Sequence, residues 1–292
     1  MTIEISLLVL LISLVIGIPV PFAFFATTVY LVFTLGYDPS FLLPYGFSKM
    51  STIVLLAIPL FIMAGGIMDK GGIGDKLVDL VDTFVGRIKG GLGVVSVVSC
   101  AVFGSITGSA CATLSCIGSI MFPRLNKSGY PAGHSAALLA NSSVLGILIP
   151  PSAIMILYSW VGNQSVLASF LSTIIPGIIL MVLLSIVNIF LLRKNKNIIL
   201  ADKMEFATFT KLIGTRSIVA APALVMPVLV LGGIYGGMMT PTEAAAIAVL
   251  YAVPVGFFIY RGLTGKKFFA VIVETATTTG VIVVMLYAVM IL

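Results

Sequence analysis

A stretch rich in glycine and hydroxyl side chains interrupts one of the most apolar parts of this chain: residues 104–116 read GSITGSACATLSC. Glycine and small hydroxyl residues weaken a helix and gain little from burial in hydrocarbon. Backbone that leaves helical geometry at membrane depth is tolerated only where it is buried in protein or lines a polar cavity. The stretch therefore predicts a break in the fold.

The composition indicates a membrane protein. Hydrophobic residues make up 60% of the 292 residues and charged residues only 9%, against about 25% charged in soluble domains. Several apolar runs approach the roughly 20 residues that cross a bilayer as a helix. We expect an all-α, multispanning integral membrane protein whose surroundings are lipid. The net charge of +6 reflects basic loops that set orientation, so we expect no nucleic-acid partner.

The apolar segments predict the order of the helices along the chain. The sequence GIPVP, with Pro19 and Pro21, separates the first two segments, so one kinked helix over 3–36 and two separate helices both fit. A polar-faced stretch at 73–88 suits an amphipathic helix lying in the membrane interface; it is either a lateral brace or a solvated connection. The segments lie at about 3–18, 19–36, 52–68, 90–123, 132–161, 166–192, 216–236, 241–260 and 268–292.

The distribution of basic residues predicts a re-entrant hairpin over 90–123. Six of the 16 basic residues lie between Arg193 and Arg216, which places that loop in the cytoplasm. If 90–123 enters and leaves on one face, all the basic residues except Lys49 fall on the cytoplasmic side. If it is a single span, this asymmetry is lost.

A weak internal similarity suggests an inverted repeat. GIPVPFAFFATTVYLVF from Gly17 resembles GMMTPTEAAAIAVLYAV from Gly237, at an offset of 220 residues (241 − 21). The span count gives the two copies opposite directions, as an inverted repeat requires. Because Leu292 corresponds to Gly72 at this offset, we expect a second repeat that stops ahead of its own hairpin and a chain that is truncated at its C-terminus.

Two predicted breaks carry the candidate chemistry. Gly104, Gly108 and the hydroxyls between them suit the tip of the hairpin, where helix ends could hold an anion or a hard cation. The alternative is helix packing through small residues. In the segment 132–161, Asn141 and its serine neighbours precede Pro150 and Pro151, which predicts a broken span or, alternatively, a simple proline kink. Elsewhere, Thr240 and Glu243 have the spacing of a capping box, and His134 is interpreted as structural. The three cysteines do not have the spacing of a metal site, and we interpret them as small buried side chains.

Four motifs resemble the large membrane subunit, the DctM-like component, of tripartite ATP-independent periplasmic (TRAP) transporters. They are FGSITGSACAT, GYPAGHSAALLANSSVLGILIPPS, IPLFIMAGGIM and MTPTEAAAIAVLYA. The resemblance implies an inverted-repeat, elevator-type transporter of the bacterial inner membrane, driven by a sodium gradient and without a cofactor. Its substrate would be an organic acid such as a C4-dicarboxylate or sialic acid. Its partners would be a periplasmic substrate-binding protein and a small membrane subunit.

The resemblance also assigns roles to residues at the two breaks, with 105–109 as the hairpin tip and 141–150 as an unwound helix. Candidate sodium ligands are Ser105, Thr107, Gly108, Ser109, Asn141, Gly146 and Pro150. Candidate substrate contacts are Ser109, Ala110, Thr113, Ser142 and Ser143.

This interpretation divides the chain into four parts. Residues 1–89 form scaffold spans and the interfacial helix, and 90–165 form the first transport unit. Residues 166–215 form a connecting span and a cytoplasmic loop, and 216–292 begin the second repeat.

Two other classes of function are alternatives to a transporter. An intramembrane enzyme would need a paired acid and base, but His134 and Glu243 fall on opposite sides of the membrane in the span count. A passive channel or scaffold subunit would not need sodium, so uptake that depends on a sodium gradient separates it from a transporter.

Overall fold

The computed structural model describes residues 2–85, 90–193, 195, 198 and 206–292, and within these ranges every regular element is a helix. Five helical segments of the described chain are long and apolar enough to cross a membrane, and a bent pair of helices would make a sixth. The expected all-α, multispanning membrane protein is therefore confirmed. The five are Ile53–Lys70, Val166–Leu192, Leu212–Tyr235, Pro241–Ile259 and Gly265–Ile291.

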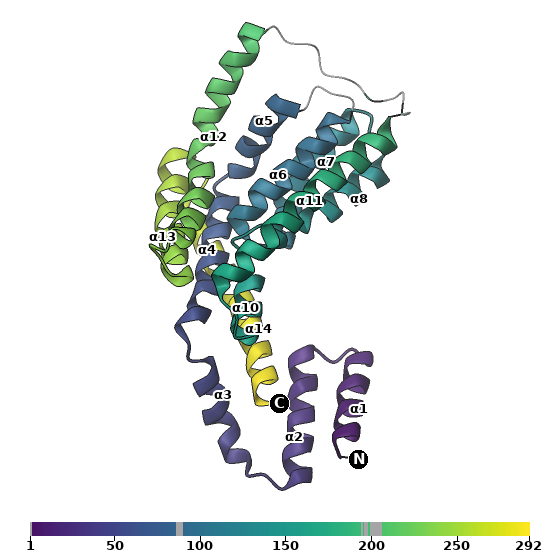
Figure 1. Ribbon diagram of the computed structural model, residues 1–292, viewed down its shortest axis with the longest axis vertical. Coiled ribbons are helices and arrows are strands. Elements are labelled where there is room, and N and C mark those ends of the chain that lie inside the picture. The colour runs from purple at the N-terminus through teal and green to yellow at the C-terminus, as the bar shows by residue number, and fades with distance from the viewer. Residues whose placement is uncertain (1, 86–89, 194, 196–197, 199–205) are drawn as a thin grey trace. The chain divides into compact units, whose positions relative to one another are not determined.

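The chain divides into two compact units, and the first comprises residues 1–55 and 273–292. Helices α1 (Thr2–Val15) and α2 (Val20–Leu35) lie side by side as a pair (Figure 1). Between them, Gly17 has a φ of +92° and Pro19 is the N-cap residue of α2, so the helix ends and restarts. Two separate helices, and not one kinked helix over 3–36, is thus the correct interpretation.

The end of α14 (Gly265–Ile291) packs against α3 (Leu42–Met50) in this first unit. A Cβ added to Gly46 would lie 2.5 Å from a ring carbon of Tyr287, so the absence of a side chain at Gly46 leaves room for the ring. The Tyr287 hydroxyl donates to the carbonyl oxygens of Leu42 and Leu43 at 3.4 Å. A short 3-10 helix, η1 (Pro39–Phe41), leads into α3.

The second unit, residues 56–272, contains the predicted hairpin. Its arms are α6 (Gly91–Thr107) and α7 (Ala110–Lys127), which pack against each other. The Gly93 amide, at the start of α6, donates to the hydroxyl of Tyr130, just past the end of α7, at 3.2 Å. Both ends of the hairpin therefore lie together, as the sequence predicts. The second arm runs four residues beyond the expected end at 123, because Pro123 is accommodated inside α7.

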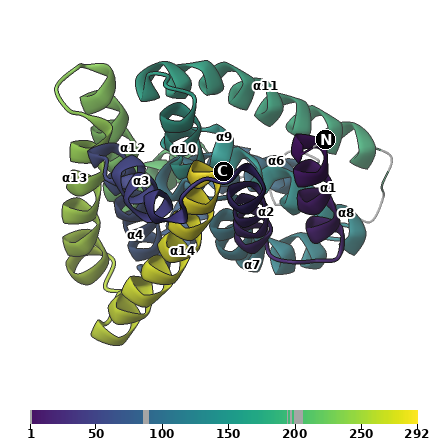
Figure 2. The same ribbon diagram turned by 90° about the horizontal axis from the view of Figure 1, so that it is seen from below.

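A broken helix follows the hairpin. Helices α8 (Ala132–Ser143) and α9 (Leu145–Leu148) continue, after residues 149–152, into α10 (Ala153–Val161) with a bend of 51°. Helix α11 (Val166–Leu192) then runs along the edge of this unit and packs on α6, α9 and α10 (Figure 2). The resemblance predicts an unwound stretch over 141–150. The observed break is shorter and later, since 141–143 are helical, Val144 is a single turn residue between α8 and α9, and the main interruption comes at the double proline.

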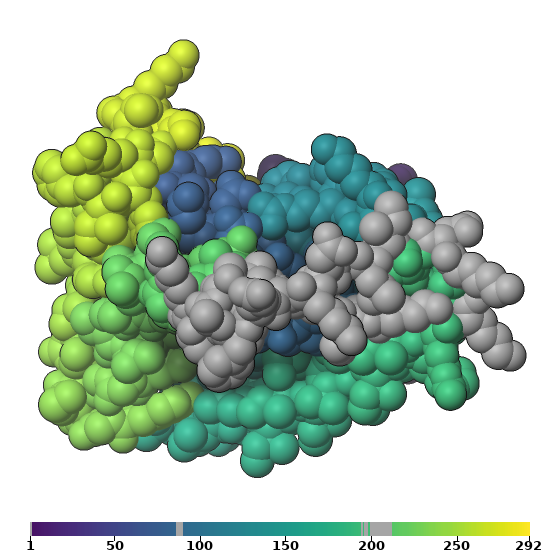
Figure 3. Space-filling view, turned by 90° about the horizontal axis from the view of Figure 1, so that it is seen from above, coloured from purple at the N-terminus to yellow at the C-terminus, as the bar shows by residue number. Residues whose placement is uncertain are grey.

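Helix α4 (Ala57–Lys70), preceded by the 3-10 turn η2 (Ile53–Leu56), forms the centre of this unit and packs closely on α13 (Pro241–Pro254). Both helices bury small residues, among them Ala64 of α4 and Ala244 and Ala248 of α13. Thr240 and Glu243 form the predicted capping box at the start of α13. In the view from above in Figure 3, a blue surface of this unit lies between yellow-green residues on one side and teal residues on the other.

Helix α5 (Ile73–Val85) is amphipathic and connects the hairpin to α12 (Phe206–Tyr235) through ion pairs. Arg124 of α7 lies 2.8 Å from a carboxylate oxygen of Asp79 and 3.6 Å from Asp75. Arg216 of α12 donates to the Asp79 carbonyl oxygen at 2.6 Å and to the Thr83 hydroxyl at 2.8 Å. The predicted amphipathic helix is thus present to Val85, and its last residues, 86–88, lie outside the described residues. Its position in the membrane interface stays a prediction. Helix α12 begins at Phe206, ten residues before the expected 216.

Candidate functional site

The hairpin tip is a two-residue turn. Gly108 has a φ of +61°, a left-handed conformation that glycine adopts without strain. Ser109 is the N-cap of α7, and its hydroxyl accepts from the Ala112 amide at 3.4 Å. The sequence placed the turn over 105–109, but Ser105 and Thr107 remain helical, so the tip is narrower than predicted.

The tip lies directly against the broken helix. A Cβ added to Gly108 would lie 2.7 Å from the Pro151 carbonyl oxygen and 3.2 Å from the Ser152 Cα. A Cβ added to Gly146 would lie 2.9 Å from the Ser109 carbonyl oxygen, and one at Gly104 would overlap the Gly146 Cα. The two breaks predicted separately from the sequence therefore meet, and we call this region, residues 104–113 and 146–152, the junction.

Helix α4 supports the junction from another side. A Cβ added to Gly65 would lie 2.7 Å from the Cα and 3.0 Å from the carbonyl oxygen of Thr107. Glycine in α4 thus lets two backbones approach closely, as small residues do in membrane helix packing. No sequence pattern around Gly65 predicted this contact.

Hydroxyl groups at the tip bond to one another and to the backbone. Thr113 donates to the Ser109 carbonyl oxygen at 2.8 Å, and its Oγ1 lies 3.4 Å from that of Thr107. Because the Thr113 proton is used on Ser109, Thr107 is the donor in the second bond. The buried Thr113 and Thr107 therefore form one connected set with the partly buried Ser109.

Ser152 differs from these residues because its hydroxyl has no hydrogen-bond partner among the residues that the structure describes. The side chain is fully buried, and it occupies the N-cap position of α10 without bonding to that helix. Buried polar atoms nearly always have a partner. The serine directly after the double proline therefore places an oxygen without a hydrogen-bond partner at the junction, and no sequence pattern pointed to it.

The electrostatics of the junction come from helix ends, because its side chains are uncharged. The N-termini of α7 and α10 bring unpaired amides, and the C-termini of α6 and α9 bring carbonyl oxygens. Helix N-termini favour anions and carbonyl oxygens favour hard cations. The arrangement can bind a small anion and a cation side by side.

Several predicted residues use their polar groups within their own helices. The Ser105 hydroxyl donates to the Val102 carbonyl oxygen at 2.7 Å, and Ser142 donates to Leu138 at 2.7 Å. Ser143 donates to Ala140 at 2.8 Å. Asn141 is exposed, and its amide nitrogen donates to the Ala137 carbonyl oxygen at 2.8 Å. Gly108, Ser109, Thr113 and Gly146 meet at the junction in the contacts above; Ala110 begins α7 and Pro150 begins the double proline.

A second polar group of residues fixes the open end of the hairpin. The buried Asn188 of α11 donates from Nδ2 to the Gly90 carbonyl oxygen at 2.8 Å, and its Oδ1 lies 3.0 Å from Nε2 of His134. Burial raises the pKa of the Tyr130 phenol, the acceptor of the Gly93 bond, above its ordinary value. His134, which the sequence favours as a structural residue, thus has a specific partner in Asn188. Of the cysteines, Cys100 is buried as expected. Cys111 is exposed and Cys116 is intermediate, so the expectation that the cysteines are buried was wrong for these two.

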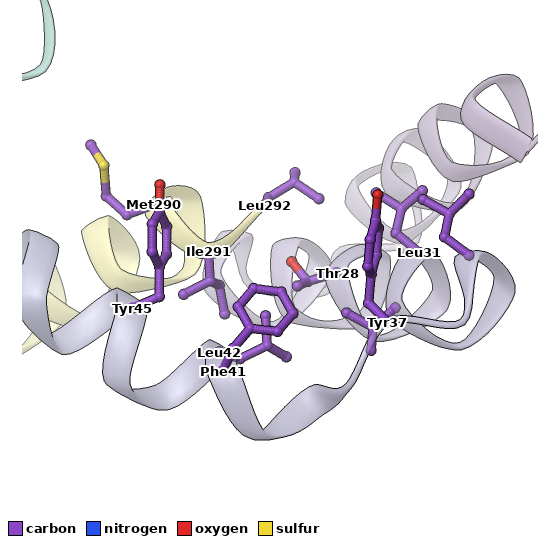
Figure 4. Close-up of a pocket in the computed structure, with 11 residues that line it drawn as sticks. Thr28, Leu31, Tyr37, Phe41, Leu42, Tyr45, Met290, Ile291 and Leu292 are labelled. Carbon is purple, nitrogen blue, oxygen red and sulfur yellow. The ribbon is translucent and has the colours of Figure 1, made fainter.

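The first unit contains a cavity of about 330 Å³ (Figure 4). Its polar groups are hydroxyls, and the Thr28 hydroxyl is used on the Phe24 carbonyl oxygen at 2.9 Å. Such a lining suits hydrocarbon and offers little to a charged solute, so the junction is the better candidate site. The lining residues are Thr28, Leu31, Val32, Leu35, Tyr37, Phe41, Leu42, Tyr45, Met290, Ile291 and Leu292.

The fold and the junction define a multispanning helical membrane protein with broken helices at one site. Residues 7–292 match the family described as "Tripartite ATP-independent periplasmic transporter, DctM component". The chain belongs to this family, which confirms the resemblance. It is a family of transporter permeases and not of enzymes.

Three curated relatives illustrate the similarity. The C4-dicarboxylate TRAP transporter large permease of Pseudomonas aeruginosa is 35% identical over 233 residues, covering 80% of this chain and 53% of that protein. The ectoine large permease of Halomonas elongata is 37% identical (79% and 53%). The sialic acid large permease of Vibrio cholerae is 31% identical (94% and 63%). The chain thus spans about half the length of the first two and somewhat more of the third, and their named substrates differ.

Proposed function

We propose that this chain is part of the permease of a secondary transporter that imports an organic acid, of the C4-dicarboxylate or sialic acid class, with a sodium gradient. In this proposal the junction binds the coupling ion and the acid. The permease is built from inverted repeats and carries the bound solute across the bacterial inner membrane by an elevator-type movement. A periplasmic substrate-binding protein delivers the acid, and a small membrane subunit braces the permease. The names of the relatives support a TRAP transporter, and they do not agree on one solute.

The meeting of two helix breaks is the observation that carries the proposal. The hairpin tip and the broken helix bring free helix ends together in a protein that is otherwise apolar. Paired helix breaks of this kind are a typical site for ions and anionic substrates in membrane transporters. The proposed ion ligands are the oxygens of the predicted sodium set, to which we add Ser152 because its hydroxyl is buried and unused.

Uptake into proteoliposomes tests the proposal. The permease is reconstituted with its small subunit and binding protein, and labelled C4-dicarboxylate and sialic acid are offered under an inward sodium gradient or an equal potassium gradient. We expect uptake of one of the two acids with sodium only. Equal uptake with potassium, or uptake without a gradient, would contradict sodium coupling.

A pair of serine variants tests the site itself. Ser152→Ala should raise the sodium concentration for half-maximal uptake, because it removes an oxygen that is free to bind the ion. Ser159→Ala is the matched control, since Ser159 is equally buried on the same helix but its hydroxyl donates to the Met155 carbonyl oxygen at 2.7 Å. An unchanged sodium dependence in Ser152→Ala would remove Ser152 from the ligand set.

A further inference from the structure

Helix α12 lacks part of its normal hydrogen bonding because it contains two prolines. Pro222 and Pro227 lie inside the helix, and proline has no amide hydrogen to donate. The carbonyl groups four residues earlier, at Ile218 and Ala223, therefore have no helical donor at these positions. The stretch 218–227 is the weakest part of the helix.

The hydroxyl of Tyr260 is inserted into this weak stretch. It donates to the Val219 carbonyl oxygen at 2.8 Å and accepts from the Ala223 amide at 3.2 Å. In a regular helix, the Ala223 amide would bond to that same Val219 carbonyl directly. A side chain inserted between the donor and acceptor of one helical turn is a recognised cause of helix bending.

A second tyrosine bonds to the same turn. Tyr251 of α13 donates its hydroxyl hydrogen to the Pro222 carbonyl oxygen at 2.7 Å. Two phenol groups from outside the helix thus satisfy backbone groups around Pro222. Satisfying these groups matters in a bilayer, where an unpaired backbone group costs several kcal/mol.

The local backbone places Tyr260 at this position. Helix α13 ends in a π-helical turn, η3 (Val255–Ile259), closed by a bond of 2.9 Å from the Tyr260 amide to the Val255 carbonyl oxygen. Arg261 then takes a φ of +53°. A π-turn is rare and often marks a functional position in a helix.

The two halves of α12 are attached to different neighbours. Before the weak stretch, Arg216 bonds to Asp79 and Thr83 of α5. After it, the buried Met226, Val230 and Ile234 belong to the half of the helix that packs toward α13. A bend at 219–223 would let the first half follow α5 and the hairpin while the second half stays with α13.

We propose that residues 219–227 of α12 form a hinge and that Tyr260 keeps the Ala223 amide and the Val219 carbonyl from forming their direct helical hydrogen bond. The tyrosine hydroxyl donates and accepts at once, so the turn can lengthen or shorten without exposing an unpaired backbone group to lipid. This inference concerns the helix alone and does not depend on which solute the protein binds.

Hydrogen exchange of the protein in lipid nanodiscs, followed by mass spectrometry, tests the hinge. The stretch 219–227 should exchange faster than 229–235 of the same helix. Tyr260→Phe keeps the ring and removes the hydroxyl, so the Ala223 amide returns to the Val219 carbonyl. We expect exchange over 219–227 to slow by about two- to tenfold, the range set by one net hydrogen bond.

Two further variants make the result decisive. Tyr158→Phe is the matched control on α10, where the residue is 64% exposed, and should change nothing over 219–227. Pro222→Ala restores a helical donor while Tyr260 is intact, and it should also slow exchange, which decides the case if Tyr260→Phe does not fold. Faster or unchanged exchange in Tyr260→Phe would mean that Tyr260 merely stabilises the helix, and it would overturn the hinge. If Tyr260→Phe does not fold, faster or unchanged exchange in Pro222→Ala would overturn the hinge in the same way.

Discussion

Gly104 and Gly146 show how single missing side chains determine the junction. Their backbones approach so closely that a Cβ at Gly104 would overlap the Cα of Gly146, and one at Gly146 would lie 2.5 Å from the Thr113 hydroxyl oxygen. Neither glycine has a positive φ, so their role here is close packing and not backbone freedom. The hairpin tip reaches the broken helix because both positions lack a side chain.

The first prediction follows from this contact. Gly104→Ala should destabilise the protein by about 1–3 kcal/mol, the usual cost of overpacking, and lower its unfolding temperature in detergent. Gly118→Ala on the other arm is the control, because its added Cβ would meet only the Leu114 side chain, at 3.6 Å. This control should be neutral or stabilising by up to about 1 kcal/mol. Equal stability of the two variants would contradict the contact.

The second prediction concerns Asn188. Because a carbonyl oxygen only accepts, the Asn188 nitrogen faces Gly90 and its oxygen faces His134, which must donate from Nε2. His134→Leu leaves the buried amide oxygen without a donor and should cost about 1–3 kcal/mol in the free energy of unfolding. His134→Gln can still donate and should recover most of that loss in the same denaturation measurement. If the leucine variant is as stable as the glutamine variant, the hydrogen bond contributes nothing.

At the level of elements, helix α5 joins the hairpin to α12 through Asp79. Its carboxylate holds Arg124 of α7, while its carbonyl oxygen holds Arg216 of α12. These groups are about one third exposed, so the ion pairs are partly screened by solvent. The helix therefore acts as a connector whose strength depends on ionic strength.

The third prediction is that Asp79→Asn weakens this connection. We expect a loss of about 1 kcal/mol or less, typical of a partly exposed ion pair, and a larger loss at low salt than at high salt. Lys76→Gln on the same helix is the control for a charge change without loss of the Arg124 pair. Thermal unfolding at two salt concentrations measures both, and a salt-independent difference would indicate that the carboxylate acts only through packing.

The sequence predicted elements better than contacts between them. Charge asymmetry and the residues around Gly108 predicted the hairpin, the double proline predicted the break, and Thr240 with Glu243 predicted the capping box. The partners of Gly65 and Asn188 could not be predicted, because they come from segments far apart in the chain and periodicity carries no information about which faces meet. For the same reason the burial of Ser152 without a hydrogen-bond partner could not be predicted. The lengths of the breaks were also overestimated, since serine and asparagine bonded back to their own helices instead of unwinding them.

At the scale of the whole molecule, the basic residues predict the orientation in the membrane. Their assignment to one side, with Lys49 as the exception, depends on both ends of the hairpin sharing that side. In the first unit the Lys49 ammonium lies 5.4 Å from the centre of the Tyr45 ring, a cation–π contact. Lys49, the basic residue that is not assigned to the cytoplasmic side, therefore has a local partner.

The fourth prediction tests this orientation by cysteine labelling. In a background without the three native cysteines, Lys127→Cys should react with an impermeant reagent only from the cytoplasmic side. Gln164→Cys, in the exposed turn before α11, should react only from the outer side. Labelling of position 127 from outside would reverse the hairpin and every later span.

The bond between Asn188 and Gly90 also has a consequence for biogenesis. The two residues are 98 positions apart, and at a synthesis rate of about 5–20 residues per second Asn188 is made roughly 5–20 s after Gly90. The hairpin therefore enters the membrane before the residue that ties down its first glycine exists. Its final anchoring waits for the translation of α11, so the nascent hairpin is a natural client for the insertion machinery during that interval.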